Sequence, residues 1–92
     1  MARVTKAMLD KKVEWISFLL DRPKAGWTKV GNKNIATVDA LELEHGNGGY
    51  ELVEVVHEGG GLMSHSPRLP AGQMADYLDA MAVALRLDER QR

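Results

Sequence analysis

Two groups of glycines constrain the fold of this chain more than any other feature of its sequence. The segments His45–Gly49 and Glu58–Gly61 supply glycines, which accept the positive φ angles that hairpin tips often require. The residues between them, Tyr50–His57, are rich in valine and other strand-forming types. The sequence therefore predicts a strand over residues 50–57 with a tight turn at each end.

Three further strands are predicted around this one. Trp27–Val30 and Ile35–Glu44 are strand-like runs on either side of Gly31–Asn34, whose residue types favour a turn. The side-chain alternation of the second run changes phase, which predicts a bulge at Asp39–Ala40. Leu62–Ser66 is a weaker strand that ends before a proline.

Apolar residues at helical spacing occupy both ends of the chain. The first helix is expected to begin after the capping residue Thr5 and to end near Arg22, whereas the second begins near Pro70. The two apolar stripes comprise Leu9, Val13, Ile16 and Leu20, and then Met74, Tyr77, Leu78, Met81 and Leu85. We therefore expect one α+β domain over residues 1–92, in which a short four-stranded antiparallel sheet is flanked by an N-terminal and a C-terminal helix.

Composition restricts the setting of the protein. The 92 residues include no cysteine, which excludes disulfides and thiolate chemistry and makes the reducing cytoplasm the expected location. No apolar run approaches the roughly 18–20 residues of a membrane span, so no membrane is expected as a partner. Residues 1–34 hold eight basic and three acidic side chains, whereas residues 35–92 hold four and ten. Two halves of opposite charge could pair across a protein interface. The chain as a whole is not basic, as a general nucleic-acid-binding protein would be, so we do not expect nucleic acid as a partner.

Two features predict a protein interface. Phe18 projects from the polar side of the first helix, opposite its apolar stripe. If Glu44 lies opposite Glu51 in the central hairpin, these two carboxylates and Glu42 gather on one face of the sheet, where they are either solvated or matched by a basic partner. A chain of this size folds with a small margin of stability, so a homodimer is expected.

A second group of residues would suit a small anionic ligand such as a nucleotide. The backbone of Gly59, Gly60 and Gly61 could approach such a ligand closely, with Ser64, His65 and Arg68 at its rim. The glycines match no dinucleotide or phosphate-loop motif, however, and a purely structural role at a hairpin tip is the simpler interpretation.

Catalytic and metal chemistry have weaker support. The three histidines, His45, His57 and His65, have no metal-ligand spacing. A hydrolase would combine Ser64 or Ser66 with a histidine and Glu58, but no nucleophile elbow or oxyanion hole is indicated. We therefore expect no catalytic residue, cofactor or metal, and a weak hydrolase is the third hypothesis after a binding protein and a ligand-binding dimer.

The run Gly48–Val53, the glycines at 59–61, Ser66–Arg68 and the helix that holds Tyr77 and Leu78 resemble small phage- and prophage-encoded proteins of unassigned function. This resemblance implies a phage or bacterial cytoplasmic setting and no catalytic residues. It favours a non-enzymatic interaction protein, an inhibitor or an adaptor, which forms homodimers and binds a host protein, for example one of a defence system.

Overall fold

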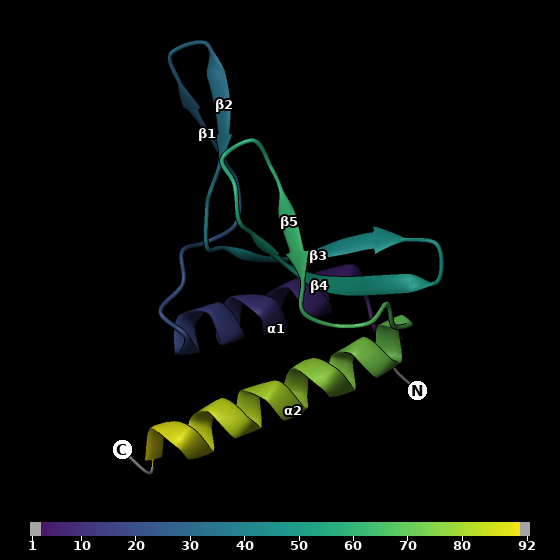
Figure 1. The fold of residues 1–92 in the computed structure, drawn as a ribbon. Coiled ribbons are helices and arrows are strands. Elements are labelled where there is room, and N and C mark those ends of the chain that lie inside the picture. Colours follow the sequence, from purple (N-terminus) through teal and green to yellow (C-terminus); the bar gives the residue numbers. More distant parts are fainter. Residues whose placement is uncertain (1–2, 91–92) are drawn as a thin grey trace.

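The computed structural model describes residues 3–90 and confirms the α+β class (Figure 1). The chain forms a helix, a series of short antiparallel strands and a second helix, in that order. The elements are α1 (Lys6–Leu19), β1 (Trp27–Val30), β2 (Lys33–Ala36), β3 (Leu41–Gly46), β4 (Gly49–Val55), β5 (Leu62–Ser64) and α2 (Ala71–Arg90).

The two helices lie side by side on the same face of one sheet, rather than on opposite sides of it (Figure 1). Thr5 caps α1 as expected, because its hydroxyl accepts a hydrogen bond from the Met8 amide at 3.3 Å. Leu9 and Ile16 of α1 are fully buried together with Leu78 of α2, so the apolar stripes of both helices meet in one core.

The three-stranded sheet has the order β3-β4-β5, and its central hairpin has the predicted register. Glu44 lies opposite Glu51, and Leu43 lies opposite Leu52. Because side chains alternate along a strand, the leucines face the helices while the glutamates face away from them. At the other end of the sheet, the face away from the helices is covered by a small cluster of Ala36, Ala40 and Val55.

The expectation of a single four-stranded sheet was wrong in its arrangement. The described residues form five strands in two sheets, because residues 35–44 do not make one bulged strand. Asp39 adopts a left-handed conformation with φ of 72°, and the chain turns there instead of continuing. The predicted bulge is therefore a complete break that separates β2 from β3.

This break produces an arm, which we define as the β1–β2 hairpin (Trp27–Ala36). The arm projects from the rest of the molecule and pairs only with itself (Figure 1). It is held at its base, where the Ala36 amide donates to the Glu58 carbonyl at 2.8 Å. The radius of gyration is 14.1 Å, compared with about 12 Å for a typical domain of this length, in keeping with this extended shape.

Gly49 is fixed by the chain that returns toward α2. Its φ of 127° lies in a region that favours glycine, and a Cβ atom there would clash with the Leu69 carbonyl oxygen. Tyr50 and Leu69 exchange two backbone hydrogen bonds of 2.7 Å immediately beside this contact. The glycine therefore allows the segment before α2 to dock against β4.

We predict that Gly49→Val strongly destabilises the protein. Backbone strain alone should cost about 1–3 kcal/mol, and the clash with Leu69 adds to it, so the melting temperature should fall by more than about 5 °C. Circular dichroism during thermal unfolding measures the change. Gly72→Ala in the first turn of α2 is the matched control, because an added Cβ meets nothing within 4 Å and should leave the melting temperature equal or higher. An unchanged midpoint for Gly49→Val would contradict this account of the turn.

Candidate functional site

The glycine turn that was predicted to approach a ligand is occupied by the base of the arm. The indole of Trp27 lies 3.1 Å from the position that a Cβ of Gly60 would take, and Gly60 has a φ of 98°. The Gly59 amide donates to Nδ1 of His57 at 2.9 Å. The close approach that these glycines permit is therefore made to Trp27 of the same chain.

Ser64 and His65 continue from this turn but have separate partners. The Ser64 hydroxyl donates to the Ser66 carbonyl at 2.9 Å, and the Ser66 hydroxyl accepts from the Leu52 amide. Nε2 of His65 lies 2.7 Å from Oε1 of Glu54. Among the described residues no serine hydroxyl is hydrogen-bonded to a histidine, so the arrangement that a hydrolase would need is not preformed.

Arg68 lies at the opposite end of β4 from the glycine turn. A seven-residue strand spans about 20 Å, so Arg68 and Gly60 do not converge on one ligand. The guanidinium lies 3.2 Å from Glu51 and 3.4 Å from Glu44, and it also donates to the Gly49 carbonyl. The basic partner of these two acidic residues is thus an arginine of the same chain.

Glu54 is the buried centre of a polar cluster that the sequence patterns do not reveal. The residue is 9% exposed, and its carboxylate contacts the partly exposed side chains of His65 and Arg22, whose Nη1 lies 3.3 Å from Oε2. The same Nη1 donates to the Asp39 carbonyl at 3.0 Å. The hydrogen bond from His65 lowers the pKa of Glu54 below its usual value of 4.5, and Arg22 lowers it further, although burial acts in the opposite direction. The cluster joins the end of α1 to β4, to the β2–β3 turn and to the segment after β5.

Phe18 is exposed as predicted, and it does not stand alone. It is 72% exposed and stacks on Trp15, whose ring centre is 5.5 Å away. Trp15 is itself 45% exposed. Phe18 and Trp15 both lie near Arg86 of α2, because they line one shallow depression.

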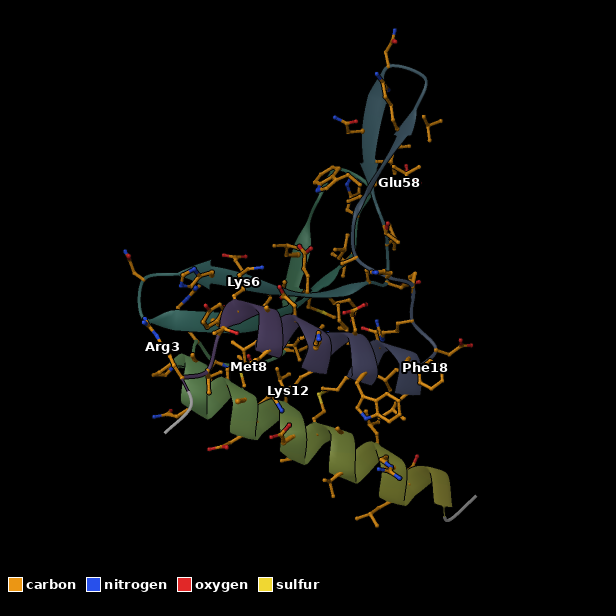
Figure 2. All side chains as sticks on the ribbon, turned by 180° about the vertical axis from the view of Figure 1, so that it is seen from behind. Arg3, Lys6, Met8, Lys12, Phe18 and Glu58 are labelled. Atoms are coloured by element: carbon orange, nitrogen blue, oxygen red, sulfur yellow. The ribbon has the colours of Figure 1, made fainter. Side chains whose placement is uncertain are left out.

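The aromatic pair belongs to a larger surface, which we call the helix-layer face. It consists of the sides of α1 and α2 that point away from the sheet, and Met8, Lys12 and Phe18 mark its α1 part (Figure 2). Its exposed large apolar residues are Met8, Trp15, Phe18, Val83 and Leu87. A group of large exposed apolar side chains on one side of a helix pair favours a protein interface there.

Charges on the helix-layer face are divided between its helices. Lys11 and Lys12 lie on α1, whereas Asp76 and Asp79 lie on α2. Lys12 and Asp79 form an ion pair of 2.7 Å, so they lie at the same level along the two helices. The face therefore has a basic and an acidic half as well as an apolar end.

Neither metal nor membrane features occur in the described part of the chain. His45 stacks on Tyr50 with ring centres 4.4 Å apart, so the three histidines occupy three different places. Residues 3–90 contain no group of three metal-ligating side chains that could hold an ion. Among these residues neither helix combines the length and apolar character that crossing a membrane requires.

We predict that Glu54 makes stability depend on pH in a defined range. Because its pKa is lower in the folded than in the unfolded chain, its ionised form stabilises the fold fully above pH 4.5, and this contribution is lost as the pH falls through the lower folded pKa. The difference in melting temperature between wild type and Glu54→Gln should therefore shrink from pH 6 to pH 3. Glu58→Gln removes an exposed carboxylate as a control. A Glu54→Gln difference that stays constant over this range would contradict the assignment.

Comparison of the chain with protein-family models, with curated proteins and with solved structures finds no match.

Proposed function

We propose that this protein is a non-enzymatic protein-binding module that acts as a homodimer, and that two copies associate through the helix-layer face. The observation that carries this proposal is the stacked Trp15–Phe18 pair, which is exposed instead of lying in the core. Exposed aromatic residues are enriched at the centres of protein interfaces.

The helix-layer face is complementary to itself. A two-fold axis that runs along the boundary between the helices places α1 of one copy on α2 of the other at the same height. Lys12 and Asp79 mark one such height, and Phe18 and Arg86 mark another. Lys11 and Lys12 of one copy then meet Asp76 and Asp79 of the second. The aromatic pair meets Val83 and Leu87 of the second copy.

The surface area of the isolated chain supports association. The accessible surface is 6477 Å², whereas a folded monomer of this mass exposes roughly 5,300 Å². The difference exceeds the roughly 800 Å² that each partner buries in a standard interface. The resemblance to small phage-encoded proteins adds a host protein as the proposed target of the dimer.

We predict a dimer at micromolar concentration that is disrupted by Phe18→Glu or by Val83→Glu, because each variant places a carboxylate in the apolar end of the interface. Sedimentation equilibrium gives the mass directly. Val56→Glu changes a comparably exposed apolar residue outside the helix layer and should leave the dimer intact. A wild-type monomer, or a dimer that tolerates both helix variants, would show that this surface is not the interface.

The absence of enzymatic activity is a separate expectation. Ser64, His65 and Glu54 are each engaged in contacts that stabilise the fold. We therefore predict no turnover of generic ester, phosphodiester or nucleotide substrates above background, with or without added zinc. Turnover that disappears in His65→Ala, while circular dichroism shows an intact fold, would replace the binding-protein proposal with an enzymatic one.

A further inference from the structure

The outer edge of β3 is a free strand edge. On β4, the backbone groups of Tyr50 and Leu52 point away from β3. Those of Tyr50 form hydrogen bonds with Leu69, whereas the Leu52 amide donates to the Ser66 hydroxyl and the Leu52 carbonyl accepts from the His65 amide. The alternate residues of β4 therefore bond to β3, and their partners there are Glu42 and Glu44. It follows that the backbone groups of Leu41 and Leu43 point away from the sheet, along an edge where no described strand pairs.

A groove of about 550 Å³ runs beside this edge, between β3 and α1. Its floor is apolar, with Val13 of α1 and with Leu41 and Leu43 of β3. Lys6 and Phe18 line it toward opposite ends of α1, as their positions in Figure 2 show. Its volume lies within the range of ligand-binding clefts. A groove between an edge strand and a helix suits an extended peptide, which can pair with the strand and place alternate side chains against the helix.

Charge specifies the chemistry of the occupant. Most carboxylates that line the groove already have cations, because Asp10 pairs with Lys6 at 2.9 Å and Glu14 pairs with Lys24 at 3.5 Å. Glu42 also lines the groove but forms no ion pair with a described residue. On an added strand, the side chain opposite Glu42 lies on the same face as this carboxylate, where a lysine or arginine would match it.

A second copy of β3 is a poor occupant. In an antiparallel pair of β3 edges centred on Leu43, Glu42 of each copy lies opposite Glu44 of the other, so like charges meet twice. In this register, which pairs the largest part of β3, like charges oppose self-association.

We infer that the α1–β3 groove binds an extended segment of another protein, in which apolar residues alternate with basic residues. The segment adds a fourth strand to the sheet next to β3. Its apolar side chains enter the groove against Val13 and Leu43, and a basic side chain pairs with Glu42. This site shares Phe18 with the dimer contact proposed for the helix-layer face, but Leu43 and Glu42 of β3, which carry the strand pairing and the charge match, do not belong to that contact.

A fluorescein-labelled seven-residue peptide of alternating valine and lysine is the probe, and its fluorescence anisotropy is measured with the full chain. We expect saturable binding that is lost when the peptide amides that face β3 are N-methylated. A peptide of alternating valine and glutamate should not bind. Equal binding of the N-methylated or the glutamate peptide, or no binding of the lysine peptide, would overturn the inference.

Variants of the chain locate the contact. Leu43→Pro removes an outward-facing amide, and relative to Leu43→Ala it should weaken binding at least about fivefold, the loss expected for one hydrogen bond. Glu42→Gln should weaken binding, whereas Glu58→Gln should not. If Leu43→Pro does not fold by circular dichroism, the N-methylated peptide decides alone.

Val83→Glu separates the two proposals, because it tests the dimer and leaves the groove unchanged. Peptide binding that persists in a monomeric Val83→Glu variant supports the groove whatever the fate of the dimer. Loss of peptide binding in that folded variant would show that the groove is not an independent site.

Discussion

The packing of two parallel helices on a single face of the β3-β4-β5 sheet determines most of what this structure can do. Leu9, Ile16, Leu52, Met74 and Leu78 are fully buried where the three elements meet. Burial of each such side chain contributes about 1.5–3 kcal/mol, so their contact provides a large part of the stability of a chain this small. Because both helices share one face, the layer they form has an outer side that the sheet cannot cover. The exposed aromatic pair is a direct result of this one-sided packing.

Ion pairs join the remaining parts to this core. Arg22 and His65 bring two distant segments to the buried carboxylate of Glu54, and Arg68 draws the segment before α2 onto Glu44 and Glu51. Removing one partner of a buried charge leaves that charge without compensation, so Glu54 needs its contacts in the folded chain. The pairs of Arg68 are more exposed and contribute less to stability. Glu42 is left available at the free edge of the sheet.

The elements that depend on local pattern could be predicted from the sequence. The Thr5 cap and the register that sets Glu44 opposite Glu51 follow from residue spacing and turn chemistry. So do both helical stripes, except that Leu20 lies beyond the end of α1 and is exposed. The position of Phe18 on the exposed side of α1 follows from the same spacing. These features need only neighbouring residues to be specified.

Other features depend on contacts between residues far apart in the chain, and these could not be predicted. The change of side-chain alternation at Asp39 fits a bulge as well as a break in the strand. The break is held by hydrogen bonds from the Asp39 amide to the Val55 carbonyl and from Arg22 to the Asp39 carbonyl, and both partners are distant in the sequence. The same holds for Arg68. The sequence suggested that it binds a small anionic ligand, whereas its partners in the structure are the carboxylates of Glu44 and Glu51. The groove beside β3 exists only because α1 packs next to that strand.

The arm has a consequence for how the molecule moves. A two-stranded hairpin alone is only marginally stable in water, and this one is attached to the body mainly through its base. Its amides should therefore exchange with solvent through local opening, at a lower free energy than those of β4, and the arm behaves as a separate cooperative unit. Trp27 lies at the base of this unit, whereas Trp15 lies on the helix layer. The emission of the two tryptophans can thus report separately on opening of the arm and on unfolding of the body.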